Sequence, residues 1–255
     1  MSAPSKNSAV ALIDVLGFKG IERNHDPAVI AETLVAARFT LEAAGKAAKN
    51  IGAHIHILGP NFALKRAWFS DTICLVAQPD AEVKHRSADE VQACLVDIVA
   101  FCVGYILRSA ALFSTPLAFR GVVTSGNALV EGNDIYFGEA IAEASDLYET
   151  AEGAFVWLSP TAASVPPLFG RGMGQRSLLR YTVPLKGGRT IDTLVVNPFI
   201  DTAPSMAQGN DVRKGIERAM KGDRLDIAIK RQNTLRFLDH VAETEPVPVK
   251  REHGL

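Results

Sequence analysis

Apolar residues along the first half of the chain fall into runs of strand length and segments with helical spacing. The run at 8–15 is apolar and ends at Leu16-Gly17-Phe18, which predicts a buried strand followed by a turn. Asp26 can cap a helix and Pro27 suits its first position, and the helix formers that follow predict a helix over 27–49. The chain therefore begins with a strand and a long helix.

Later elements follow from the same patterns. Ser87 and Glu90 have the spacing of a capping box, which predicts the start of a second helix. After the first helix the expected elements are strands at 53–58 and 67–77 with a turn near Gly59 and Pro60, a helix from 87 to about 113, a strand at 116–126 extended through 128–132, a helix at about 139–149, a strand at 154–159, a loop at 160–178 and a hairpin at 179–185 and 190–196.

This order predicts an α+β protein with a ferredoxin-like βαββαβ core, in which two helices cover one face of an antiparallel sheet and the other face stays open. The extra hairpin follows this core. The expected organisation is a disordered N-terminus at 1–7, a catalytic domain at 8–200, a charged helical extension at 201–243 and a frayed tail at 244–255.

Composition narrows the class of protein. With 255 residues, 47% of them hydrophobic, the chain can bury a large core. A net charge of -1 disfavours nucleic acid as the main partner. No secretory signal is recognisable, and charges at Asp97 and Arg108 interrupt the longest apolar run, so we expect a cytoplasmic protein without a membrane segment. The cysteines lack CxxC spacing and are expected to be reduced.

Two acids stand in apolar surroundings that penalise a charge. Asp14 lies in ALIDVLGF and Asp71 in AWFSDTICLV. In a ferredoxin-like sheet the strands that carry them are neighbours, so the carboxylates can converge, and they repel unless a proton or cations lie between them. Paired divalent ions bridged by such acids serve in phosphoryl displacement. Alternatively, each acid caps a turn or pairs with one of three basic residues, Lys65, Arg66 or Arg120.

Several motifs resemble those of class III nucleotide cyclases. They are IDVLGF at 13–18, FSDTICLV at 69–76, FRGVVTSGNALV at 119–130, IYFGEAIAEASDLYE at 135–149 and LKGGRTIDTLVV at 185–196. The similarity runs in unbroken order from about residue 8 to residue 197. Among these cyclases the chain looks most like the pyrimidine cyclases of bacterial anti-phage Pycsar systems.

The resemblance implies roles for particular residues. Asp14 and Asp71 would hold two Mn²⁺ or Mg²⁺ ions, with the carbonyl of Val15 as a further ligand. The backbone N–H groups of the turn would meet the triphosphate, and Lys186 would grip its terminal phosphates. The turn residues in question are Leu16, Gly17 and Phe18.

Departures from the family pattern concern the base and the transition state. Ala67 and Ile135 stand where purine cyclases read the base, and neither side chain can hydrogen-bond, which favours a pyrimidine. Ala142 and Asp146 replace the asparagine and the arginine that family members carry on the helix after Gly138. The missing arginine needs a substitute, which we assign to Arg120. Other possible donors are Arg66, Arg176 and Arg180.

The sequence thus leads to one preferred hypothesis and two alternatives. The preferred one is a uridylate cyclase that forms cyclic UMP and pyrophosphate from UTP, acts as a homodimer with sites at the subunit interface, and makes a product for a separate effector protein. The choice of UTP rests on the resemblance alone. The alternatives are a cytidylate cyclase acting on CTP, and an inactive nucleotide sensor with the same fold.

Overall fold

The chain folds around one mixed sheet with helices on both faces. The computed structural model describes residues 6–18, 25–55, 62–80, 87–132, 135–165, 177–199, 206–222 and 224–244. In chain order the elements are β1 (Lys6–Val15), α1 (Pro27–Ile55), β2 (Phe62–Phe69), β3 (Thr72–Pro79), α2 (Ala88–Ala111), β4 (Phe119–Glu131), β5 (Ile135–Phe137), α3 (Glu139–Leu147), β6 (Val156–Leu158), α4 (Pro160–Ala163), β7 (Leu178–Leu185), β8 (Arg189–Val196), α6 (Met206–Ala219) and α7 (Leu225–Glu243).

The first strand lies in the middle of the sheet. The strand order is β2-β3-β1-β4-β6-β8-β7, and β5 pairs separately with β4. β1 is antiparallel to both of its neighbours, and its register places Asp14 opposite Thr72 of β3 and opposite Arg120 of β4. The predicted α+β architecture, with the terminal hairpin β7–β8, is confirmed.

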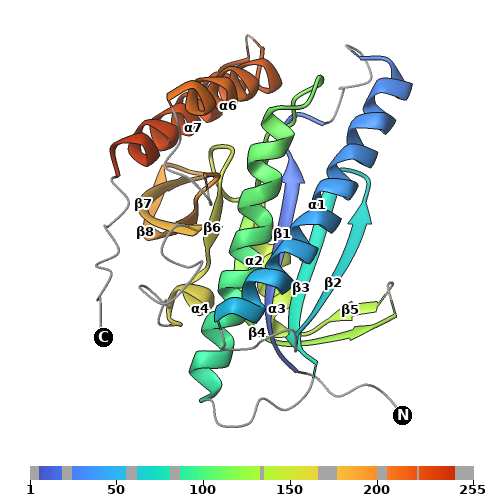
Figure 1. Ribbon diagram of the computed structural model, residues 1–255. Helices are drawn as coiled ribbons and strands as arrows, with labels where there is room; N and C mark the ends of the chain where they lie inside the picture. Colours follow the sequence, from blue (N-terminus) through green and yellow to red (C-terminus); the bar gives the residue numbers. More distant parts are fainter. Residues whose placement is uncertain are drawn as a thin grey trace, which may run out of the picture.

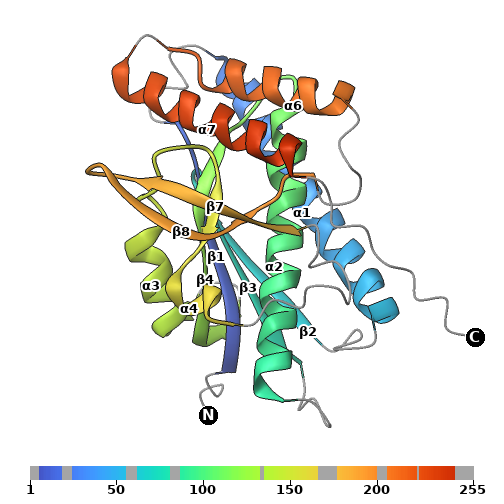
Figure 2. The same cartoon turned by 90° about the vertical axis from the view of Figure 1, so that its left-hand side faces the viewer.

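The helices form two layers. α1 and α2 cover one face of the sheet, and α3 lies against the other, as the two views in Figures 1 and 2 show, so the expectation that this second face stays open is wrong. The capping box predicted for α2 is present, with Ser87 and Glu90 bonded reciprocally. Among the described residues, α2 is the one helix long and apolar enough to cross a membrane, but 83% of its apolar window is buried inside the protein. α2 is apolar because most of its residues lie in the core of the protein.

Some sequence predictions need correction. The strand predicted at 53–58 is wrong for 53–55, which end α1, and the rest of it lies outside the described residues, as does the turn at Gly59 and Pro60. The segment predicted as one strand at 67–77 is instead part of the hairpin β2–β3, whose turn is formed by Ser70 and Asp71. Ser70 adopts a φ of 55°, which a hairpin turn requires and which glycine or asparagine would normally signal.

The ends of the chain also differ from expectation. Lys6 and Asn7 pair with β4, so the expected disordered N-terminus is wrong for these two residues, and residues 1–5 lie outside the described part. The predicted loop at 160–178 contains the short helix α4. The charged C-terminal segment forms helices α6 and α7, and residues 245–255 of the expected frayed tail are outside the described part.

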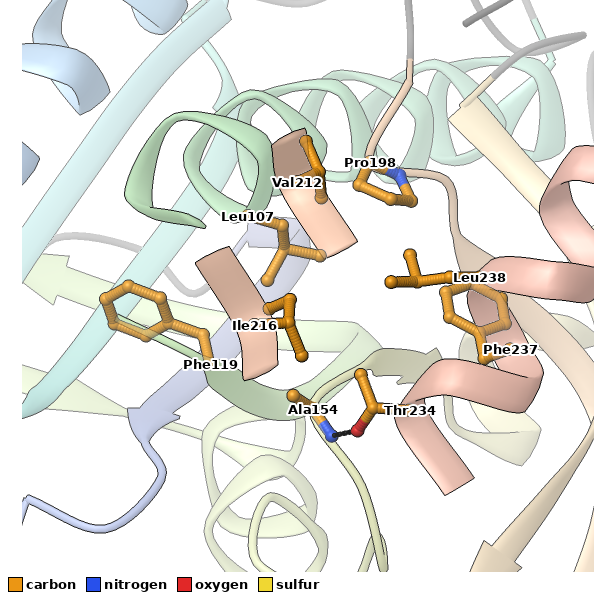
Figure 3. A pocket seen from close by; sticks show the side chains of 9 residues that line it. All are labelled: Leu107, Phe119, Ala154, Pro198, Val212, Ile216, Thr234, Phe237 and Leu238. Atoms are coloured by element: carbon orange, nitrogen blue, oxygen red, sulfur yellow. Dashed lines mark hydrogen bonds between the residues drawn. The ribbon is translucent and has the colours of Figure 1, made fainter. Parts of the chain in front are cut away.

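Of the C-terminal helices, α6 packs against α2 and α7 packs against β7. A side chain at Gly215 of α6 would meet the carbonyl of Ala111, so glycine permits the close approach of α6 to α2. Thr234 of α7 accepts a hydrogen bond from the Ala154 N–H at 2.7 Å (Figure 3). Around this bond an apolar cavity of about 20 Å³ remains between α2, β4 and the two helices. The space is hardly larger than one water molecule, so the contact is nearly closed.

Replacing Thr234 with valine should destabilise the protein by about 1–3 kcal/mol, because the shape is kept while the buried Ala154 N–H loses its acceptor. Urea denaturation measures the change. As a control, Thr244→Val at the exposed end of α7 should shift the stability by less than about 0.5 kcal/mol. Equal stability of Thr234→Val and the wild type would show that this bond does not hold α7.

Candidate active site

Asp14 is a nearly buried carboxylate at the end of the central strand. It is 7% exposed. Its Oδ1 accepts a hydrogen bond from the Thr72 hydroxyl at 3.3 Å, and its Oδ2 accepts one from Nη2 of Arg120 at 3.4 Å. Both partners lie opposite Asp14 in the register of the sheet, so the pairing of β1 with β3 and β4 fixes this cluster.

Asp71 reaches the same place from the tip of the β2–β3 hairpin. Its carbonyl accepts a hydrogen bond from the Val15 N–H at 3.1 Å, which attaches the turn to the end of β1. The indole of Trp68 donates to the Ser70 carbonyl at 2.7 Å and stiffens the turn. The sequence prediction that the two acids converge at one edge of the sheet therefore agrees with the geometry.

The two carboxylates influence each other's charge. Burial raises the pKa of Asp14 to about 6, and the negative charge of Asp71 adds to this increase, whereas Arg120 opposes it. The raised pKa means that the anionic form of Asp14 lacks sufficient positive charge around it. A divalent cation between the acids would supply that charge.

Arg120 connects this pair to a second group of charges. Its Nη1 donates to the Glu149 carbonyl at 3.1 Å, and its Nη2 lies 3.6 Å from the Glu149 carboxylate. The same carboxylate oxygen lies 3.6 Å from Nζ of Lys186, in the turn between β7 and β8. The structure thus brings together Asp14, Asp71, Arg120 and Lys186, which come from four different parts of the sequence.

Glu149 and its neighbour Tyr148 were not identified from the sequence. Although burial opposes it, the charges of Arg120 and Lys186 lower the pKa of Glu149. Burial, followed by the charges of Glu149 and Asp14, raises the pKa of Tyr148. Both residues close the motif at 135–149, but the motif gave them no role, and only the fold reveals that Glu149 lies between Arg120 and Lys186.

The turn after β1 has fewer free backbone N–H groups for an anion than the sequence analysis predicted. The Leu16 N–H donates to the Ala118 carbonyl at 2.8 Å, and the Phe18 N–H faces the Val15 carbonyl at 3.4 Å. Gly17 has a φ of 77° and is exposed, and its N–H has no acceptor among the described residues. Three backbone N–H groups were expected to meet a triphosphate. Among the described residues, the N–H of Gly17 is the one of the three without an acceptor.

The positions expected to face a base lie away from this cluster. Ala67 of β2 is buried, separated from β1 by β3. Ile135 of β5 is 52% exposed and pairs with Glu131, at the opposite end of β4 from Arg120. Eleven residues of extended strand span about 35 Å. One nucleotide bound at Asp14 could not reach Ile135 of the same chain.

The other basic residues considered for the transition state differ in position from Arg120. Arg66 pairs with Glu42 of α1, on the face of the sheet that α1 and α2 cover. Arg180 lies in β7 beside α7, where its carbonyl contacts His240. Arg176 lies outside the described residues, and Ala142 and Asp146 are exposed on α3. Within the described part of the chain, Arg120 is the guanidinium that contacts the carboxylate cluster.

The acid pair fits a divalent cation by its chemistry. Mg²⁺ and Mn²⁺ prefer oxygen ligands, and two converging carboxylates beside the Val15 carbonyl would provide them. Within the residues that the structure describes, no group of three or more His, Cys, Asp or Glu side chains could hold a metal ion. The candidate site therefore depends on the two acids and on backbone oxygen.

Comparisons with known proteins place this site in a familiar fold. No family model and no curated protein matches the sequence. Among solved structures, the monomeric guanylyl cyclase domain of the RhoGC fusion protein from the aquatic fungus Blastocladiella emersonii is 13% identical, with a TM-score of 0.52 over 77% of this chain and 98% of that one. A double mutant of that domain gives a TM-score of 0.51 at 14% identity, over 77% and 97%.

A third structure, the guanylate cyclase domain of RhGC from Catenaria anguillulae in complex with GTP, is 16% identical over 76% of this chain and 98% of that one, with a TM-score of 0.49. At such identities the likeness concerns the fold alone. The conclusion about the fold rests on the two Blastocladiella structures, whose TM-scores exceed 0.5. The chain has the fold of class III nucleotide cyclase catalytic domains, as the motifs predicted.

Replacing Asp71 with asparagine should stabilise the metal-free protein at alkaline pH. The folded-state pKa of Asp14, about 6, exceeds the ordinary pKa of an aspartate, 3.8, so its contribution to stability is full below pH 3.8 and is lost as the pH rises through 6. Removing the charge of Asp71 lowers the folded-state pKa of Asp14 and restores on the order of 1 kcal/mol at pH 8, with a smaller gain at pH 5.

Urea denaturation in EDTA at both pH values measures this difference. Asp211→Asn, which removes an exposed carboxylate of α6, is the matched control and should give no pH-dependent gain. If Asp71→Asn is less stable than the wild type at pH 8, the two carboxylates do not repel each other in the folded protein.

Proposed function

We propose that the protein is a pyrimidine nucleotide cyclase that converts UTP to 3′,5′-cyclic UMP and pyrophosphate. The observation that carries this proposal is the convergence of Asp14 and Asp71 beside Arg120 and Lys186 in a cyclase fold. Such a site combines a place for divalent cations with positive charges for a triphosphate. Its chemistry suits displacement at phosphorus with loss of an anionic leaving group.

In the proposed reaction the ribose 3′-oxygen attacks the α-phosphorus. A new P–O bond forms, the bond from the α-phosphorus to the bridging oxygen breaks, pyrophosphate leaves with the bonding electrons, and the hydroxyl proton passes to water. Lys186 would neutralise the leaving phosphates, and Arg120 would stabilise charge on the reacting phosphate from its position beside Asp14.

Asp14, Asp71 and the Val15 carbonyl would hold two Mn²⁺ or Mg²⁺ ions. When bound, these ions would lower the pKa of the 3′-hydroxyl and neutralise the pyrophosphate. The chain's own contribution is to bury Asp14 and to hold the two acids close together at the end of β1. Asp14 is held by Thr72 and Arg120, and Asp71 by the bond of its carbonyl to Val15.

A homodimer with sites at the subunit interface is part of the proposal. Its support is the distance within one chain between the cluster at Asp14 and Ile135, at opposite ends of β4. If both serve one nucleotide, they come from different subunits, and a twofold axis then yields two equivalent sites. Ile135 and Phe137 of β5, which are exposed in the single chain, would be covered in such an assembly.

The biological setting that we propose is bacterial anti-phage defence of the Pycsar type, in a cytoplasmic enzyme whose cyclic nucleotide acts on a separate effector protein. It rests on the sequence resemblance given above. The inactive sensor remains the competing hypothesis, since Ala142 and Asp146 supply neither the amide nor the guanidinium that active family members use. Turnover by the purified protein distinguishes the two.

The nucleotide preference tests the proposed substrate. With Mn²⁺ present, kcat/KM for UTP should exceed that for ATP and GTP by about tenfold or more, because Ala67 and Ile135 offer the polar edge of a purine no side-chain partner. Chromatography of products from each labelled nucleotide provides the measurement. A preference for ATP or GTP would contradict the pyrimidine pocket, and a preference for CTP would replace the product.

Asp14→Asn should reduce turnover by more than about a hundredfold at saturating Mn²⁺, since it removes a metal charge while keeping the side-chain volume. Circular dichroism should match that of the wild type, and the melting temperature in EDTA should not fall, because the variant also loses the repulsion from Asp71. Asp211→Asn is again the control and should retain full activity. Normal turnover by Asp14→Asn would rule out the assignment of Asp14 as a metal ligand.

A further inference from the structure

One carboxylate oxygen of Glu149 lies between two cations of the candidate site. It is 3.6 Å from Nη2 of Arg120 and 3.6 Å from Nζ of Lys186. A phosphate oxygen makes the same kind of charge-assisted contacts with guanidinium and ammonium groups. The position of the Glu149 carboxylate is therefore one that an anionic ligand would also favour.

Hydrogen bonds to main-chain carbonyls hold the Arg120 guanidinium, and the turn that carries Lys186, independently of this carboxylate. Arg120 donates to the main-chain carbonyl of Glu149 at 3.1 Å, and that contact does not involve the acid group. The Lys186 N–H donates to the Thr150 carbonyl at 2.8 Å, so the turn that carries the lysine is attached to the same segment. Removing the carboxylate would leave the guanidinium and the turn where they are.

The Glu149 side chain also has room to leave. It is 48% exposed, whereas the side chain of Arg120 is 10% exposed and fixed between Asp14 and the Glu149 carbonyl. Rotation of the Glu149 side chain into water would free one face of each cation without moving the sheet. The ion pairs that it gives up are of the partly exposed, weak kind.

We infer that the Glu149 carboxylate occupies the place of a substrate phosphate oxygen between Arg120 and Lys186, and that a triphosphate must displace it to bind. The identity of the anion as a nucleotide triphosphate rests on the proposed function. The competition itself depends only on the positions of the three charged groups. Glu149 thus weakens substrate binding, and it discriminates against anions too weak to replace it.

Calorimetric binding of inorganic triphosphate with Mn²⁺ tests this inference without requiring turnover. Glu149→Gln should bind the probe about three- to tenfold more tightly than the wild type, because the competing charge is gone. Glu152→Gln is the matched control, three residues along the same segment, and should bind like the wild type. The main chain of Glu152, like that of Thr150, is hydrogen-bonded to the β7–β8 hairpin: the Glu152 N–H donates to the Pro184 carbonyl.

A double substitution separates competition from a general charge effect. The gain of Glu149→Gln should disappear when it is combined with Lys186→Gln, because the cation that the two anions share is then missing. If Glu149→Gln binds triphosphate no more tightly than the wild type, if Glu152→Gln gains equally, or if the gain survives the loss of Lys186, the inference is wrong.

Enzyme kinetics then separate this inference from the proposed function. In an active protein, Glu149→Gln should lower KM for the nucleotide by a similar factor with little change in kcat. Tighter triphosphate binding by Glu149→Gln in a protein that turns over no nucleotide would support the competition and refute the cyclase activity. If the protein turns over UTP but Glu149→Gln binds triphosphate no more tightly than the wild type, the cyclase activity is supported and the competition by Glu149 is refuted.

Discussion

A carboxylate at the end of a central strand is stable only if positive charge lies beside it, and in this protein Arg120 supplies that charge. The pair exists because β1 and β4 are antiparallel with Asp14 opposite Arg120. A slip of β1 by one residue against β4 would turn Asp14 to the face opposite Arg120 and leave a buried charge unpaired. The site and the register of the sheet therefore depend on each other. Even so, the pKa of Asp14 stays raised, which leaves the cluster suited to additional positive charge.

The segment that follows α3 joins the site to the rest of the molecule. The main chain of Glu149 and Thr150 holds Arg120 and Lys186, and Glu152 bonds both to Pro184 of β7 and to Asn233 of α7. Two residues later the Ala154 N–H bonds to Thr234. α7 thus braces the segment that positions the cations.

The fold of this chain and the chemistry of its site are set by different residues. A likeness at 13% identity to a guanylyl cyclase domain preserves the arrangement of strands and helices. In this chain Ala67 and Ile135 carry no hydrogen-bonding side-chain groups, and the Glu149 carboxylate lies between the cations of Arg120 and Lys186. Specificity in such a fold is a matter of a few side chains on an unchanged frame.

The amino-acid sequence by itself determined the order of most elements, since apolar periodicity and capping signals act over neighbouring residues. It predicted α1 and α2, the terminal hairpin, and the convergence of Asp14 and Asp71 through the motifs that contain them. It could not place the β2–β3 turn, because Ser70 adopts a left-handed conformation without a glycine to signal it. Nor could it find Glu149, whose role depends on cations that lie 29 and 37 positions away along the chain. Contacts of that kind form only when the sheet pairs and brings distant residues together, so the tertiary structure alone decided the charge balance of the site.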